Sequence, residues 1–168
     1  SSDVCCSDLG SIVVYAQVLG GEKPIDNSVD QLVSIEKDFK LDDPSIIREM
    51  YGRLELVKSE LVSLILSLKN EGKSIAGFGA ARAGTTLLSY FGIGNELEFL
   101  VDDNSEKHYK YSPGDKLEVL PTNEIYNKKP DYVIILAWLF SDKIIEKHSG
   151  FISSGGKFIT IFPEVGII

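Results

Sequence analysis

Hydrophobic residues change their spacing along this chain of 168 residues. In the first part they recur every three to four positions, over residues 27–40 and again from Pro44 to the residues before Gly72, which predicts two helices. Asp43 before Pro44 is typical of a helix start, and Gly72 is typical of a helix end. Gly52 predicts a kink or break in the second, long helix.

The long helix carries an apolar stripe, which is expected to be buried and consists of Ile47, Leu54, Leu61 and Ile65. From residue 73 onward, apolar segments alternate with helical ones. The apolar segments, which we predict to be strands, are residues 74–78, 97–101, 117–120, 132–137 and 157–161. The helical segments are residues 80–91, 123–127 and 141–149. Strands that are apolar throughout are buried on both faces, so we predict an α/β fold with a Rossmann-like, doubly wound, mainly parallel sheet of about five strands.

The remaining segments suggest a division into domains. A β-branched run predicts a strand at residues 10–20, and neither it nor the long helix belongs to the alternating unit. We interpret residues 10–72 as the tail of a preceding domain with its connector helices, and residues 73–168 as a C-terminal domain, of which residues 73–164 are expected to fold alone. Residues 1–9 resemble a translated sequencing adapter and are expected to be a non-native leader. The chain is therefore expected to be a fragment.

Composition excludes several classes of protein. A net charge of −8 disfavours nucleic acid and anionic membranes as partners. No apolar run approaches the roughly 18 residues of a membrane span, so a cytoplasmic location is expected. The cysteines, Cys5 and Cys6, are adjacent and lack the spacing of a zinc site.

The stretch "GFGAARAG" carries the first candidate site. It lies between a predicted strand and a predicted helix, so the amides of the four residues Gly79 to Arg82 are expected to be unpaired at a helix N-terminus, where an anion binds favourably. The candidate binding residues are Gly77, Gly79, Ala80, Ala81, Arg82 and Gly84. A cation in the first turn, Arg82, also favours an anion nearby. The alternative is that the glycines only permit a tight turn and close packing.

Further candidates lie at the ends of other strands. Asp102, or Asp103, is placed to accept hydrogen bonds from a ribose diol, or else to cap the next segment. Trp138 ends the strand expected beside the glycine loop, where its ring covers a ligand or belongs to the core. Pro113 and Gly114 form a turn in a polar loop that is expected to fold over a nucleotide.

The sequence contains no recognisable catalytic constellation. His108 and His148 have no partner in a motif, and both are expected on the surface. We therefore predict no catalytic residue and no metal ligand in this chain.

Four stretches in order, "GKSIAGFGAARAGTTLLSYFGI", "VDDNSEKHYKYSPGDKLEVL", "KPDYVIILAW" and "SSGGKFITIFPEV", resemble the C-terminal domain of the S-adenosylmethionine-dependent sugar C-methyltransferases. The resemblance covers residues 72–164. It implies a three-part enzyme with a four-cysteine zinc module, a central methyl-donor domain with the acid and base residues, and a domain like this one that helps to bind a nucleotide-linked deoxysugar, expected to be a dTDP sugar. The chain alone is then expected to be inactive.

The chain departs from the family pattern at five positions, which are Phe78, Arg82, Asp115, Lys116 and Leu139. Leu139 replaces an asparagine that is common in the family, and Asp115 and Lys116 replace a Thr-His pair. The loss of the amide and of the imidazole removes hydrogen-bonding groups, which is expected to affect which sugar is bound. Two other hypotheses remain open. One is an NAD(P)-binding domain of an oxidoreductase, and the other is a non-catalytic interaction domain.

Overall fold

The computed structural model of this chain describes residues 2–3, 13–24 and 26–168. The chain divides into two compact units, Ser1–Arg53 and Leu54–Ile168. The predictions for residues 1–9 and for the two cysteines therefore fall almost entirely outside the described residues.

In the first unit, β1 (Ser2–Asp3) pairs antiparallel with β2 (Val13–Val14). The strand predicted over residues 10–20 is wrong in extent, because residues 15–24 lie in turns and irregular loops. Among the described residues β2 pairs with the two-residue β1. The first predicted helix is confirmed as α1 (Ser28–Asp38).

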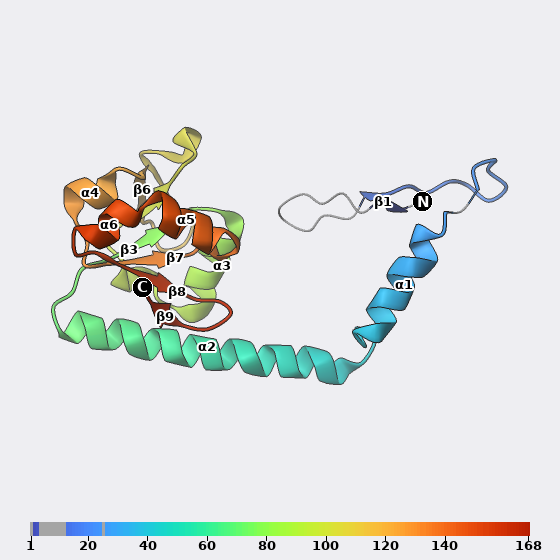
Figure 1. Cartoon of the computed structure of the whole chain (residues 1–168), viewed down its shortest axis with the longest axis horizontal. Helices are drawn as coiled ribbons and strands as arrows, with labels where there is room; N and C mark the ends of the chain where they lie inside the picture. Colours follow the sequence, from blue (N-terminus) through green and yellow to red (C-terminus); the bar gives the residue numbers. More distant parts are fainter. Residues whose placement is uncertain (1, 4–12, 25) are drawn as a thin grey trace. The chain divides into compact units, whose positions relative to one another are not determined.

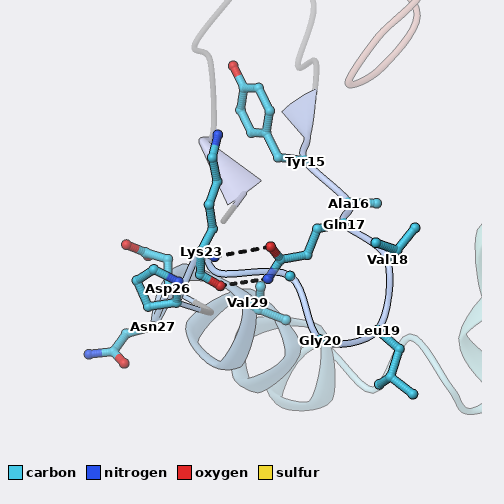
Figure 2. Close-up of a pocket in the computed structure, with 12 residues that line it drawn as sticks. Tyr15, Ala16, Gln17, Val18, Leu19, Gly20, Lys23, Asp26, Asn27 and Val29 are labelled. Carbon is cyan, nitrogen blue, oxygen red and sulfur yellow. Dashed lines mark hydrogen bonds between the residues drawn. The ribbon is translucent and has the colours of Figure 1, made fainter.

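The loop before α1 is closed by a glutamine side chain (Figure 2). The Gln17 Nε2 donates to the Lys23 carbonyl at 2.6 Å, and the Gln17 Oε1 accepts from the Lys23 amide at 3.2 Å. The open hollow bounded by this loop is lined by exposed side chains such as Val18 and Leu19. None of the predicted binding residues lies in it.

The long helix is confirmed as α2 (Pro44–Asn70), and it continues through Gly52 without a break. The predicted interruption is wrong because one glycine costs only about 1 kcal/mol, which a helix of this length tolerates. At its start the Asp43 Oδ1 accepts from the Ser45 amide at 2.8 Å, as expected of a cap. Gly72 follows its end with a φ of +75°.

The part of α2 within the second unit supplies side chains to its core. Leu61 and Ile65 are both 0% exposed, Leu68 is buried and Leu54 is half-buried. Ile47, predicted to share this stripe, is instead 55% exposed. It belongs to the first unit. The compact unit thus contains the end of α2 together with residues 73–168.

Within residues 54–168, all of which are described, a sheet of seven strands has the order β5-β6-β4-β3-β7-β8-β9. The five central strands are parallel and are β6 (Glu118–Pro121), β4 (Leu100–Asp102), β3 (Ile75–Phe78), β7 (Tyr132–Ile135) and β8 (Lys157–Thr160). The strand that comes first in this unit, β3, lies at the centre, and the chain winds outward from it in both directions. The predicted doubly wound parallel sheet is confirmed.

Two edge strands pair antiparallel and were not predicted, β5 (Lys110–Tyr111) beside β6 and β9 (Gly166–Ile167) beside β8. Helices cover both faces (Figure 1). One core lies between the sheet and two helices, α2 and α3 (Arg82–Phe91). The other lies under α4 (Glu124–Lys128), α5 (Ser141–Lys147) and α6 (Ser149–Ser153). Short 3-10 turns occupy η1 (Gly94–Glu96), η2 (Ser105–Lys107) and η3 (Trp138–Phe140).

His148 was expected on the surface, and this prediction is wrong, because the residue is only 5% exposed. It joins α5 to α6 and packs between two rings, 5.3 Å from the Phe78 centroid and 5.9 Å from that of Tyr126. Its Nδ1 lies 3.1 Å from the Tyr126 hydroxyl, and its Nε2 is buried with no hydrogen-bond partner among the described residues. Burial lowers the pKa of His148, with a further lowering from Lys147 and an opposing effect of Asp103.

We expect the stability of the chain to fall as the pH drops below about 6.5, the ordinary pKa of histidine. In that range the unfolded chain binds a proton at His148 that the folded chain does not, so the free energy of unfolding decreases by at most about 1.4 kcal/mol per pH unit for this group. Urea unfolding at pH 7.5 and 5.5 measures the loss. His148→Phe keeps an aromatic ring and is expected to lose less on acidification. An equal loss of unfolding free energy in the parent and in His148→Phe would contradict the assignment of this pH dependence to His148.

Candidate functional site

The glycine-rich loop begins where three neighbouring strands end. The amides of Leu136 and Ala137, at the end of β7, donate to the Phe78 carbonyl at 2.9 and 3.2 Å. On the other side of β3, the Gly79 amide donates to the Val101 carbonyl of β4 at 2.7 Å. The loop is therefore fixed to both neighbours of the central strand, at the carboxyl edge of the sheet where ligands bind in folds of this type.

Close packing requires glycine within this loop. Gly79 has a φ of +107°, and a Cβ on it would lie 2.8 Å from the Ala137 Cβ. A Cβ on Gly84 would lie 2.6 Å from the Gly79 carbonyl oxygen, and one on Gly77 would lie 2.6 Å from the Leu100 side chain. These contacts hold α3 close to the strand ends. Packing alone therefore explains why these three positions are glycine, and the glycines by themselves do not indicate that a ligand binds.

Four consecutive loop amides were expected to be unpaired, and for two of them this is wrong. Gly79 donates to β4 as described, and the Ala80 amide donates to the Asp102 Oδ2 at 2.7 Å. The reason is that β4 runs beside β3 and brings its end to the loop. In the described part of the chain the amides of Ala81 and Arg82 have no acceptor, and the Arg82 side chain is exposed with no ion pair.

Asp102 is the most connected side chain at this edge, and it is only 8% exposed. Besides Ala80, its carboxylate accepts from the Asn104 amide at 2.9 Å and from the Lys107 Nζ at 2.9 Å. Burial alone raises the pKa of Asp102, but the hydrogen bonds from Asn104, Lys107 and Ala80, with the charge of Lys107, outweigh it and hold the pKa below its ordinary value. Asp102 is therefore an ionised carboxylate that ties the glycine loop to the segment after β4.

A cleft of about 350 Å³ lies between these segments. Three parts of the chain line it, namely the start of α3, the segment after β4 and the β5–β6 hairpin. The lining residues are Ala80, Thr85, Asn104, Glu106, Lys107, Lys110, Tyr111, Ser112, Pro113 and Val119. Two of the predicted binding residues, Ala80 and Pro113, are thus brought together from segments distant in sequence.

The other predicted residues do not line the cleft. Gly114 follows Pro113 in the turn with a φ of +81°. Trp138, in η3, packs its ring against Phe162 at 5.2 Å in an edge-to-face arrangement and is half-buried, so its ring makes a core contact. Asp103 lies at the surface, where it pairs with Lys147 at 2.7 Å.

Asp115 and Leu139 are two of the positions at which the chain departs from the family pattern. Asp115 lies over Gly94, where a Cβ would be 2.0 Å from its Cγ. Leu139 is exposed. The Asp115 side chain therefore packs directly against the backbone of Gly94.

Sequence reasoning missed the residues that build the cleft wall. Lys107, which pairs with Asp102, was not predicted to take part in the site. The buried Ser112 was not predicted either, although its Oγ accepts a hydrogen bond from the Leu117 amide at 3.0 Å and shapes the hairpin. His108, expected on the surface, is half-buried with its Nε2 2.8 Å from the Asp102 carbonyl. One local pattern could have predicted the turn that carries Lys107. Asn104 is the N-cap residue of η2, and its side chain accepts a hydrogen bond from the Glu106 amide.

Two features are absent from the described residues. No group of three or more His, Cys, Asp or Glu side chains there is placed to hold a metal ion. Among the same residues, no helix combines the length and apolar character needed to cross a membrane.

Comparison with known proteins identifies the family. Residues 8–163 match the protein family described as the C-methyltransferase C-terminal domain. The chain is 30% identical over 169 residues to C-methyltransferase NovU from Streptomyces niveus, a match that covers 99% of this chain and 40% of NovU. This chain therefore spans less than half the length of that relative. Among solved structures, UDP-D-quinovosamine 4-dehydrogenase from Vibrio fischeri matches 55% of this chain and 79% of its own, with 19% identity and a TM-score of 0.40.

The family match extends over the glycine loop, the Asp102 carboxylate and the cleft wall, and it agrees with the resemblance seen in the sequence. The chain belongs to the C-methyltransferase C-terminal domain family.

Proposed function

We propose that the Leu54–Ile168 unit binds the nucleotide-linked sugar on which an S-adenosylmethionine-dependent C-methyltransferase acts. The observation that carries this proposal is the cleft that begins at the carboxyl ends of β3 and β4, between the glycine loop and the segment after β4, and continues along the β5–β6 hairpin. A pocket of this size, with a few polar groups converging on it, suits part of a nucleotide-sized ligand.

In this proposal the glycine loop receives the diphosphate of a dTDP-linked deoxysugar. Arg82 supports the assignment, because a cation in the first turn of α3 opposes the helix dipole and has no carboxylate partner in the described part of the chain. An anionic ligand would remove this conflict. The turn at Pro113 and Gly114 closes one side, and Trp138 borders the loop through its neighbour Ala137.

The reaction passes a methyl group to a sugar carbon that has lost a proton beside a keto group. Around the cleft, the described residues include no nucleophile and base within hydrogen-bonding distance of each other. We assign the acid and base residues, the methyl donor and the zinc module to parts of the proposed enzyme other than this unit. The chain by itself is therefore not expected to transfer methyl groups. We place its action in the cytoplasm.

An NAD(P)-binding domain of an oxidoreductase is the second candidate. The position of Asp102 at the end of the strand beside the glycine loop favours it, since an acidic residue there accepts from the ribose diol of a dinucleotide. Both carboxylate oxygens of Asp102 already accept hydrogen bonds from the protein, and the side chain is buried. This engagement favours the nucleotide-sugar proposal over the dinucleotide one.

Titration of the chain with dTDP, NAD and S-adenosylmethionine separates these candidates, with the fluorescence of Trp138 as the signal. The chain contains one tryptophan, so any change reports on the neighbourhood of the loop. We expect a saturable response to dTDP alone. A response to NAD alone would favour the oxidoreductase, and no response to any of the three would favour a non-catalytic interaction domain.

We expect Arg82→Ala to weaken dTDP binding by about 1.5 to 3 kcal/mol, the usual contribution of a hydrogen bond to a charged group. The fold is expected to remain, because Arg82 is exposed and unpaired. Arg48→Ala, which removes another exposed arginine, in the first unit, is the control and is expected to bind as the parent does. Unchanged affinity of Arg82→Ala with a lower melting temperature would show that the arginine is structural.

A further inference from the structure

The wall of the cleft presents lysines although the chain as a whole is acidic. Lys107 and Lys110 line it with one carboxylate, that of Glu106, and Asp102, which does not line it, pairs with Lys107, so the charges balance there, whereas the net charge of the chain is −8. A balanced patch in an acidic protein repels an anion less than the rest of its surface does.

Lys107 is held in position before any ligand arrives. Its Nζ lies 2.9 Å from the Asp102 Oδ2, and its side chain is about one-third exposed, at 35%. The backbone around it is fixed at two points, since the Asn104 Oδ1 accepts from the Glu106 amide and the His108 Nε2 lies 2.8 Å from the Asp102 carbonyl. Such a cation does not have to be ordered on binding, which lowers the entropic cost of a contact with it.

The remaining wall fits the uncharged part of a nucleotide. Lys110 donates to the Glu106 carbonyl, so its side chain folds back onto the segment that carries Lys107. Tyr111 follows in β5 and is 68% exposed although it lines the cleft. An exposed aromatic ring beside lysine side chains offers a stacking surface for a base.

We propose that the cleft is a phosphate-binding subsite in which Lys107, held by Asp102, contacts a phosphate of the ligand while Tyr111 contacts its base. This inference rests on the proposed function and adds to it a second cation, from a different segment than Arg82. Asp102 acts here as a positioning residue. It orients Lys107 through one oxygen and the glycine loop through the Ala80 amide on that same oxygen.

The test compares two lysines that each pair with an aspartate at the end of β4. Lys107→Met removes the cation in the cleft, and Lys147→Met removes the exposed one that pairs with Asp103 outside it. Lys107→Arg keeps the charge. Each chain is titrated with dTDP, inorganic pyrophosphate and thymidine, and its circular dichroism and melting temperature are recorded to confirm folding.

We expect Lys107→Met to bind dTDP and pyrophosphate at least about tenfold more weakly than the parent, in line with the loss of a hydrogen bond to a charged group. Thymidine binding is expected to stay the same, Lys107→Arg to recover most of the loss, and Lys147→Met to match the parent. If Lys107→Met binds dTDP as the parent does, or loses thymidine binding equally, this inference is overturned while the proposed function stands. If the parent binds no dTDP, both are overturned.

Discussion

Gly79→Val is expected to destabilise the chain by about 2 to 6 kcal/mol, the sum of a strained backbone and an overpacked contact. The φ of +107° at this position is one that a β-branched residue rarely adopts, and the Cβ would lie 2.8 Å from the Ala137 Cβ and 3.0 Å from the Ala137 amide nitrogen. The new side chain would therefore push β7 away from β3.

A matched glycine separates the two causes. Gly155 has a similar φ of +99° but has no atom within 4 Å of its Cβ position, so Gly155→Val carries the backbone strain alone. Urea unfolding of both variants gives the two free energies. We expect the Gly79 variant to lose clearly more stability, together with any dTDP binding. Equal losses would mean that the contact with Ala137 relaxes without cost.

A chain that begins at Lys73 is expected to be unstable, whereas one that begins at Leu54 is expected to fold. The shorter chain lacks Leu61, Ile65 and Leu68, which are buried in the same core as α3 and the sheet. Burying three such side chains contributes about 4.5 to 9 kcal/mol, at about 1.5 to 3 kcal/mol each. That is comparable to the whole stability of a typical domain, about 5 to 15 kcal/mol.

This expectation differs from the sequence-based prediction that residues 73–164 fold alone. The pattern of strands and helices accounts for a complete sheet, but burial indicates that one face of that sheet depends on α2. Circular dichroism and thermal unfolding of the two shortened chains test the point. In the full chain, Leu61→Ala is expected to cost about 2 to 5 kcal/mol, and Leu66→Ala, at an exposed position on the same helix, within about 0.5 kcal/mol. A stable chain beginning at Lys73 would contradict this account.

The parallel sheet was predictable because its strands are buried on both faces. Such strands are continuous apolar runs, and the lengths between them leave room for helices. The edge strands β5 and β9 escaped prediction, since each has two residues and exists only through antiparallel pairing with a neighbour. β2 also has only two residues, and it lies within a run that was predicted to be a longer strand.

The candidate site was predictable only in part. The glycine loop and Asp102 follow from their places at strand ends. The hydrogen bond between Asp102 and Ala80 depends on the packing of β4 against β3, which no local pattern reveals. His148 became buried because Phe78 and Tyr126, both distant in sequence, close around it. Lys107 gained its place through the η2 turn, whose only local signal is the asparagine that caps it.

The most direct test of the central claim, that this unit binds a nucleotide-linked sugar at the carboxyl edge of its sheet, is an NMR titration of the isotope-labelled chain with dTDP. Amide shifts detect weak binding and report its place. We predict saturable changes confined to the cleft and the glycine loop, at positions such as Ala81, Arg82, Lys107 and Tyr111. No change, or changes only among residues 13–53, would contradict the claim.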